Sequence, residues 1–159
     1  MNGLEILYSL DDAQLLKGWK WQVRKHCHHY YLRRSTKVQG EYKTFLFHKL
    51  IAEIIFGDLE GKYIDHINGN SLDNRRENLR LATPMQNSQN MKKPRTNTSG
   101  YKGVSWSKAR SKWLATINVN KKLIYLGLFV EIVDAAKAYD KAAKEHFGTY
   151  ALTNFSKEF

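Results

Sequence analysis

The chain has 159 residues, and its 26 Lys and Arg against 15 Asp and Glu give a formal net charge of +11. This length suits one ordinary domain or two small ones, and the charge, with 13% aromatic residues, predicts a polyanionic partner, nucleic acid before an anionic membrane. The single cysteine, Cys27, excludes an internal disulfide framework and a zinc site built from several cysteines. No apolar run approaches the ~20 residues of a membrane span and no signal peptide is visible, so we expect a soluble, intracellular protein without a membrane partner.

Two long stretches of the chain contain no acidic residue. Residues 13–40 carry seven Lys or Arg, and the second stretch extends from Asn78 to Val130. One such run often marks a solvated face. Two in a short chain favour contact with a polyanion, because random placement would mix the signs.

The first predicted elements are a short helix, a sheet and a second helix. Residues 9–18 predict a helix with Ser9 as its N-cap. Residues 19–47 are rich in aromatic and β-branched side chains and predict two or three antiparallel strands, broken near residues 39–40. Residues 48–56 predict a short amphipathic helix. Its expected apolar face consists of Leu50, Ile51, Ile54 and Ile55.

The next unit is predicted to be strand, long loop, strand and helix. Residues 62–66 and 79–82 predict the strands, and the Asn- and Gly-rich residues 68–74 predict the loop. Thr83-Pro-Met-Gln86 fits a helix start, because Thr at N-cap and Gln at N3 form a capping box with Pro at N1.

A basic, polar linker over residues 92–100 leads to a second set of elements. Residues 101–106, 113–118 and 123–129 predict three strands, and residues 132–147 predict an amphipathic helix. Apolar residues at three- and four-residue spacing form its expected buried face: Ile132, Ala135, Ala136, Tyr139, Ala142, Ala143 and Phe147.

Four polar residues of the middle unit form a candidate site. Asp65 and His66 end a predicted strand, Asn78 precedes the next one, and Asn87 lies one turn inside the capped helix. Each alone is more often structural or part of a turn. Together they offer two oxygen ligands and one base, and a hard divalent cation such as Mg²⁺ prefers oxygen ligands.

Residues 42–95 resemble the HNH endonuclease family, whose fold is the ββα-metal finger. The matching segments are Phe47-His-Lys-Leu-Ile-Ala52, Ile64-Asp-His-Ile-Asn-Gly-Asn70, Asp73-Asn-Arg-Arg-Glu-Asn-Leu-Arg80 and the helix that carries Asn87.

The resemblance implies a role for each residue of the site. His66 is expected to be the general base, and Asp65 and Asn87 are expected to hold one divalent metal ion. Asn78 is expected to brace the loop and orient His66 through its carboxamide, and Arg80 to contact phosphate. The family often has His where this chain has Asn87, and the oxygen ligand favours Mg²⁺ or Mn²⁺ over a softer metal.

Other histidines receive plainer interpretations. His48 is expected to pack at a helix start rather than to act in catalysis. The His26-Cys-His-His29 cluster suggests zinc, but neighbours on a strand point to opposite faces, so we favour a strand that lies on DNA or in the core.

Residues 98–155 resemble an AP2 domain, on the motifs Tyr101-Lys-Gly-Val104, Lys112-Trp-Leu-Ala-Thr-Ile117, Tyr125-Leu-Gly-Leu-Phe129 and Leu152-Thr-Asn-Phe155, and on the Ala-rich helix. The resemblance implies a three-stranded sheet in the DNA major groove. The residues expected to face DNA are Lys102, Ser105, Ser107, Thr116, Asn118 and Tyr125, with Trp106, Lys108, Arg110 and Lys112 nearby. Plant members have arginines at several of these positions, so we expect binding weighted towards the DNA backbone.

The sequence thus predicts an α+β protein with a ββα-metal HNH nuclease domain over residues 1–95 and an AP2-like three-stranded sheet and helix over residues 96–159. The expected activity is metal-dependent nicking of double-stranded DNA by a homing-type enzyme, a monomer or weak dimer in the cytoplasm of a bacterial or phage-infected cell. Two alternatives stay open: a DNA-binding regulator with an inactive nuclease domain, and an RNA-directed protein.

Overall fold

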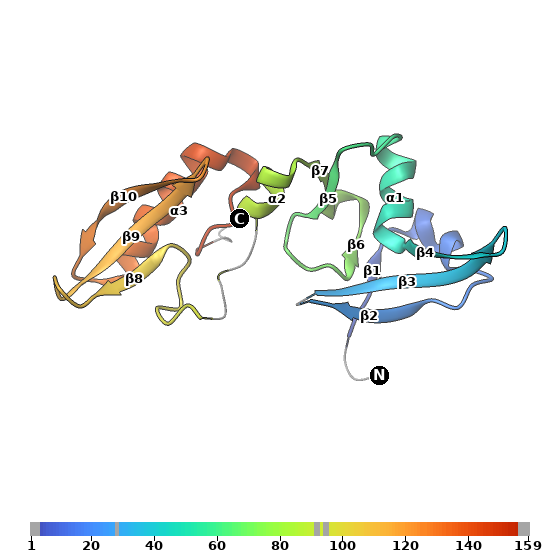
Figure 1. Cartoon of the computed structure of the whole chain (residues 1–159), viewed down its shortest axis with the longest axis horizontal. Coiled ribbons are helices and arrows are strands. Elements are labelled where there is room, and N and C mark those ends of the chain that lie inside the picture. The colour runs from blue at the N-terminus through green and yellow to red at the C-terminus, as the bar shows by residue number, and fades with distance from the viewer. Residues whose placement is uncertain (1–3, 28, 91–92, 94–95, 156–159) are drawn as a thin grey trace. The chain divides into compact units, whose positions relative to one another are not determined.

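The computed structural model describes residues 4–27, 29–90, 93 and 96–155. The chain divides into two compact units, residues 1–87 and 88–159, each with its own core (Figure 1). The expected boundary between residues 95 and 96 falls beside residues 94 and 95, which lie outside the described residues, and it stays a prediction.

The first unit combines three small sheets with short helices. Strands β2, β3 and β4 form an antiparallel sheet, β5 pairs antiparallel with β7, and β1 pairs parallel with β6. The sequence predicted two or three strands between residues 19 and 47, and three are present. The strands predicted at residues 62–66 and 79–82 and the helix after them are also present, but the predicted loop over residues 68–74 ends in the short strand β6, which pairs with β1. The elements are β1 Leu7–Tyr8, the 3₁₀ helix η1 Leu10–Leu16, β2 Gln22–His26, β3 His29–Val38, β4 Glu41–Leu46, α1 Phe47–Phe56, β5 Tyr63–His66, β6 Asp73–Asn74, the 3₁₀ helix η2 Arg76–Asn78, β7 Leu79–Ala82 and α2 Pro84–Gln89. The last two residues of α2, Ser88 and Gln89, belong to the second unit.

Helix α1 packs one side on the core of this unit. Phe47 and Ile51 are fully buried there, and Leu32 of β3 and Leu79 of β7 pack against them. The predicted apolar face was wrong in one position, because Ile54 is 55% exposed. The buried residues are Phe47, His48, Ile51 and Ala52, a stripe at helical spacing that Ile54 does not join.

The predicted N-cap of the first helix has another function. Ser9 precedes a 3₁₀ helix, and its side chain makes no cap hydrogen bond. Instead, its hydroxyl accepts a hydrogen bond from the backbone N–H of Arg76 at 3.0 Å. Ser9 therefore connects the amino-terminal segment to the residues before β7.

The second unit is a three-stranded antiparallel sheet with one long helix against it. The order is β10–β9–β8, and the three predicted strands and the predicted helix are confirmed. At the β9–β10 turn, Asn120 and Lys121 have φ of 52° and 65°, the left-handed geometry of a tight hairpin turn. The elements are β8 Val104–Ser107, β9 Lys112–Val119, β10 Lys122–Phe129, α3 Ile132–Phe147 and the 3₁₀ helix η3 Gly148–Tyr150.

One face of this sheet is covered by α3. Val104 and Ala115 pack with Ala135 and Ala136, and a neighbouring cluster joins Ile117 to the next helix turns. The helix residues in these clusters are mostly alanines, which let the backbone of α3 approach the sheet closely. Because side chains alternate along a strand, the residues between those in the clusters point away from α3.

A buried carboxylate ties the carboxyl-terminal segment to α3. Asp140 is 7% exposed, and it accepts hydrogen bonds from the backbone N–H groups of Asn154 at 2.7 Å and Phe155 at 2.8 Å. The side chain of Asn154 in turn bonds to both backbone groups of Lys102. The network fixes the turn before β8.

Within the described ranges, no helix has the length and apolar character of a transmembrane span.

Candidate active site

The β5–β7 pair carries Asp65 and His66 in the interior of the first unit. Asp65 lies opposite Arg80 in the strand register, and His66 lies opposite Leu79. Both candidate residues are buried, with 5% of Asp65 and 7% of His66 exposed. Two ionisable side chains held this deep need defined partners.

Arg80 is the partner of Asp65. Its Nε and Nη2 donate to Oδ2 of the carboxylate at 2.8 Å and 2.6 Å. This pair balances the charge of a buried carboxylate and fixes its orientation. Arg80 was expected to contact phosphate; the structure places its guanidinium on Asp65, and a phosphate contact stays a prediction.

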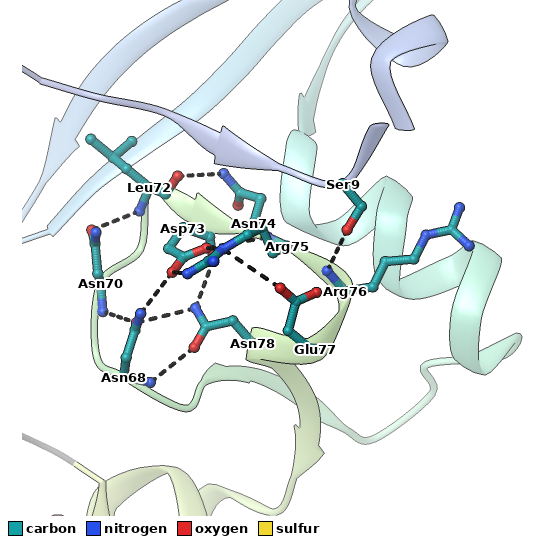
Figure 2. Close-up of polar contacts among 10 residues, drawn as sticks. All are labelled: Ser9, Asn68, Asn70, Leu72, Asp73, Asn74, Arg75, Arg76, Glu77 and Asn78. Atoms are coloured by element: carbon teal, nitrogen blue, oxygen red, sulfur yellow. Dashed lines mark hydrogen bonds and ion pairs between the residues drawn. The ribbon is translucent and has the colours of Figure 1, made fainter. Parts of the chain in front are cut away.

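Asn74 contacts His66 directly. Its Oδ1 lies 3.4 Å from Nε2 of His66. Its Nδ2 donates to the carbonyl of Leu72 at 3.1 Å (Figure 2). The second bond sets which end of the carboxamide faces the imidazole. An oxygen there favours the neutral tautomer with its proton on Nε2, which places the lone pair on Nδ1. The sequence analysis missed Asn74, because an Asn in an Asn-rich loop looks like turn chemistry.

Asn78 closes the loop that carries Asn74 (Figure 2). Its Oδ1 accepts from the backbone N–H of Asn68 at 3.0 Å, and its Nδ2 donates to the carbonyl of Asp73 at 2.7 Å. The predicted bracing of the loop therefore has a structural basis. The carboxamide bonds to Asn68 and Asp73, so an orienting effect of Asn78 on His66 would pass through the loop.

Arginines next to the loop pair with buried acids. Arg75 binds both carboxylate oxygens of Asp73 at 2.8 Å and 2.7 Å, and these hydrogen bonds hold the pKa of the Asp73 carboxyl below its usual value. Arg76 binds both oxygens of Asp12 at 3.0 Å and 2.6 Å. Both guanidinium groups therefore balance the charge of a buried carboxylate.

His48 belongs to a stack of rings that reaches His66. Its imidazole is 5.3 Å from the His66 ring, edge to face, and 5.3 Å from the ring of Tyr31, centroid to centroid. Burial lowers the pKa of His48 to about 3. Burial also lowers the pKa of His66, and the bond to Asn74 opposes this effect. Both rings are therefore neutral at pH 7, the state in which His66 can accept a proton.

Asn87 lies on the short helix after β7. The predicted capping box is present: the N–H of Thr83 donates to Oε1 of Gln86 at 2.8 Å, and the N–H of Gln86 donates to Oγ1 of Thr83 at 3.3 Å. The backbone N–H of Asn87 donates to the carbonyl of Thr83 at 2.9 Å, and its side chain is half-buried. The box thus fixes the first turn, which carries Asn87.

Comparisons with known proteins identify the family of the region that contains the candidate residues. The family model described as HNH endonuclease matches residues 45–89, which include all four candidate residues. The chain is 31% identical over 157 residues to the uncharacterized HNH endonuclease L560 of Acanthamoeba polyphaga mimivirus, and the match covers 92% of this chain and 72% of that protein. The chain belongs to the HNH endonuclease family.

Three further similarities cover parts of this HNH protein. Protein 3.8 of Escherichia phage T7 is 56% identical over 63 residues, which are 40% of this chain and 52% of that protein, so the match spans about half of the phage protein. APETALA2-like protein 2 of Oryza sativa subsp. japonica is 45% identical over 60 residues, 36% of this chain and 14% of the plant protein. A solved structure concerning DNA binding and cleavage by the HNH homing endonuclease I-HmuI has 38% identity and a TM-score of 0.38, over 45% of this chain and 40% of that chain.

The donor atoms of the HNH site suit a hard cation. In the part of the chain that the structure describes, no group of three or more His, Cys, Asp or Glu side chains is arranged to hold a metal. The carboxylate of Asp65 and the carboxamide of Asn87 offer oxygen. A cation held by one or two protein oxygens and completed by water and phosphate is typical of Mg²⁺. The donor chemistry of these residues therefore fits a hard divalent cation.

The histidine-rich segment differs from the expected strand. β2 ends at His26, β3 begins at His29, and the two residues face each other across a hairpin. Cys27 has a φ of 52° in the turn, and His28 lies outside the described residues. We expected these side chains not to converge on one ion, because neighbours along a strand point to opposite faces. This reason does not apply to His26 and His29, which lie on different strands and pair with each other.

The predicted DNA-facing residues of the second unit lie mostly on the side of the sheet away from α3. Thr116 pairs with Tyr125 and Asn118 with Leu123, and residues directly opposite share a face. We give the name open face to five of the predicted residues together with Leu123, which was not predicted: Ser105, Ser107, Thr116, Asn118, Leu123 and Tyr125. Lys112 pairs with Ser107 on the same side.

Other predicted DNA-facing residues lie elsewhere. Trp106 is on the opposite side of β8, with its ring 5.0 Å from that of Trp113. Lys102 is half-buried, its Nζ donates to the carbonyl of Gln89 at 2.7 Å, and burial lowers its pKa to about 8. Lys108 and Arg110 are exposed in the β8–β9 turn.

Lowering the pH from 7 to 5 is expected to destabilise the first unit through His48. A histidine in the unfolded chain binds a proton below about pH 6.5, whereas the folded-state pKa is about 3. The unfolded state therefore binds more protons between these values. The free energy of unfolding of the first unit should therefore be nearly constant above about pH 6.5. Below that value it should fall by about 1.4 kcal/mol per pH unit, a total loss of about 2 kcal/mol at pH 5.

Urea denaturation between pH 7 and pH 5 measures this slope. The His48→Asn variant should show a smaller slope than the wild type, with a remainder from His66, whose pKa is lowered in the same direction. An unchanged slope in the variant would assign the effect to other groups.

Proposed function

We propose that this protein is a metal-dependent DNA endonuclease that hydrolyses phosphodiester bonds, with cleavage in the first unit and duplex binding in the second. The observation that carries the proposal is the buried, neutral imidazole of His66, whose Nε2 faces Asn74 and whose neighbour is the carboxylate of Asp65. Family membership supports the nuclease chemistry.

The proposed reaction begins with proton transfer to His66. Nδ1 accepts a proton from the attacking water, and the new P–O bond forms as the bond from phosphorus to the 3′-oxygen breaks. The leaving 3′-oxygen takes a proton from a solvent water and becomes a hydroxyl. Asp65 and Asn87 would hold the metal ion, which when bound supplies charge stabilisation at the phosphate and at the leaving oxygen. Asn74 lies against Nε2 of the imidazole, so the neutral ring carries its lone pair on Nδ1.

Charge and shape of the second unit support duplex DNA as its partner. The open face is uncharged, and exposed cations flank it in the turns, with Lys108 and Arg110 before β9 and Lys121 and Lys122 before and at the start of β10. No acidic residue occurs between Asn78 and Val130. The AP2-like motifs and the similarity to the plant protein support this assignment. Phosphate contacts from the turns would set the register of the sheet on the duplex.

A single site per chain makes nicking the expected activity. One chain with one His66 cuts one strand per encounter, so a double-strand break would need a dimer or two sequential nicks. Cleavage at one preferred position of the neighbouring genome would support a homing-type enzyme, and scattered cleavage would support a general nuclease.

A plasmid-nicking assay tests the proposal. Wild-type protein with Mg²⁺ should convert supercoiled plasmid to open circles, and EDTA should stop the reaction. If no conversion occurs over a wide range of protein and metal concentrations while the protein still binds DNA, the alternative of a DNA-binding regulator is correct. If duplex RNA competes better than duplex DNA, the partner is RNA.

The variant Asn74→Ala is expected to lower the cleavage rate about 10- to 100-fold, because an outer partner that orients a reacting histidine typically contributes this much. The affinity for DNA should not change. Single-turnover cleavage at saturating protein and equilibrium binding measure the two quantities separately.

Asn70→Ala is the matched control, since Asn70 is an exposed residue of the same loop. If both variants slow cleavage equally, the effect of Asn74 comes from the loop rather than from the contact with His66.

A further inference from the structure

One row of the open face combines a carboxamide with an exposed aliphatic side chain. Asn118 of β9 and Leu123 of β10 are directly opposite in the register, next to the β9–β10 turn. Leu123 is 71% exposed, and Asn118 is exposed as well. Directly opposite residues have Cβ atoms about 5 Å apart, so one partner can contact both side chains.

The register of the two strands under this row is fixed by the core. The neighbours of the two residues along their strands, Ile117 and Ile124, pack in one cluster with Tyr139 of α3. A slip of register would move these residues out of the core, so Asn118 and Leu123 are held on the open face. A pair fixed in this way can recognise a ligand of matching geometry.

The chemistry of the pair matches the major-groove edge of an A·T base pair. A carboxamide forms two hydrogen bonds with adenine, accepting from the N6 amino group and donating to N7, and an apolar side chain contacts the C5-methyl group of thymine. These groups lie at opposite ends of the same base-pair edge. We propose that Asn118 and Leu123 read an A·T base pair in the major groove; this rests on the proposed binding of duplex DNA by the open face.

The surroundings of the pair favour this ligand over a G·C pair. Guanine is usually read by Arg or Lys, which bind its O6 and N7. The open face itself has no charged residue, and Lys112, which shares its side of the sheet, lies six residues from Asn118 along β9, about 20 Å away. The next row, Thr116 opposite Tyr125, offers a methyl group and an exposed ring.

The lysines at the turn place the pair near a phosphate backbone. Lys121 and Lys122 are exposed and adjacent to Leu123 in the chain. They can hold the sheet against phosphates while the row faces the groove, a division of contacts typical of DNA readers. Reading of the base pair and affinity for the backbone should therefore be separable by mutation.

The experiment uses the full chain carrying His66→Ala, in buffer without added metal, so that cleavage of the bound DNA is strongly slowed. A pool of randomised duplexes is first selected for binding, and each A·T pair of the selected site is then changed in two ways. Uracil in place of thymine removes only the methyl group, and 7-deazaadenine removes only the N7 acceptor. Equilibrium affinities are measured for this protein and for versions that also carry Asn118→Ala, Leu123→Ala or, as a control, Val130→Ala, which truncates a 70% exposed apolar residue outside the open face.

At one A·T position we expect a specific pattern of losses. 7-Deazaadenine should weaken binding about tenfold, and the Asn118→Ala version should be insensitive to it. Uracil should weaken binding about fourfold, and the Leu123→Ala version should be insensitive to that change. Val130→Ala should keep both sensitivities. Because Asn118 and Leu123 are exposed, their variants should keep the circular dichroism spectrum of the parent.

The outcomes separate this inference from the proposed function. The protein could bind selected duplexes although no A·T position shows this pattern of losses, or Asn118→Ala could change the response to a selected G·C pair. Either result overturns the reading of A·T by the row and leaves the proposed DNA binding intact. If duplex binding is absent, or if charge-removing variants of the flanking turns leave it unchanged, the proposed function of the open face fails as well.

Discussion

The His66→Ala variant is expected to cut DNA at least about 10²-fold more slowly than the wild type, and up to about 10⁴-fold, because it removes the group that accepts the proton of the attacking water. Its affinity for DNA should stay close to that of the wild type, since binding is assigned to the other unit. Single-turnover cleavage with excess protein measures the first quantity, and binding in the absence of added metal measures the second.

A second histidine variant controls for nonspecific effects of the substitution. His146 is exposed on α3, and His146→Ala should leave cleavage unchanged. Because His66 is buried beside His48, the circular dichroism and thermal melting of His66→Ala must match the wild type before its rate is interpreted. A folded His66→Ala protein that cuts at the wild-type rate would show that another group is the base.

Local sequence signals predicted the elements well. The helix at residues 132–147 was expected from apolar spacing and a following glycine, and α3 has these bounds. The capping box at Thr83 was expected from three residues, and both of its hydrogen bonds are present. Such signals depend on neighbours in the chain, so the sequence contains them in full.

Contacts between distant residues could not be predicted in this way. Asp12 and Arg76 are 64 residues apart, and nothing near either residue indicates that they form a buried pair. Asp140 lies in a helix whose sequence predicts one apolar and one charged face, so a carboxylate there is expected to be exposed. It is buried instead, because it binds the carboxyl-terminal segment. Asn74 was hidden for a similar reason: its role depends on a histidine eight residues away that the loop folds back to meet.

The Gly103→Ala variant is expected to lower the free energy of unfolding of the second unit by about 3 kcal/mol or more. Gly103 has a φ of +74°, a conformation that costs an alanine about 1 kcal/mol or more. A Cβ there would also overlap the ring of Tyr139 and lie 2.7 Å from the carbonyl oxygen of Thr116. Tyr139 belongs to α3 and is buried against the sheet, so its ring can move only by disturbing the core.

Gly148→Ala separates strain from overlap, because Gly148 also has a positive φ, +54°, but a Cβ there would meet nothing within 4 Å. It should cost only about 1 kcal/mol. Hydrogen exchange of the full chain measures both variants, since peptides from β8 to α3 should lose protection in Gly103→Ala while peptides from β3 to α1 keep it. DNA affinity should fall with that loss of protection. Equal effects of the two variants would mean that the ring of Tyr139 yields without cost, and that the close approach of the β8 turn to α3 does not stabilise the sheet.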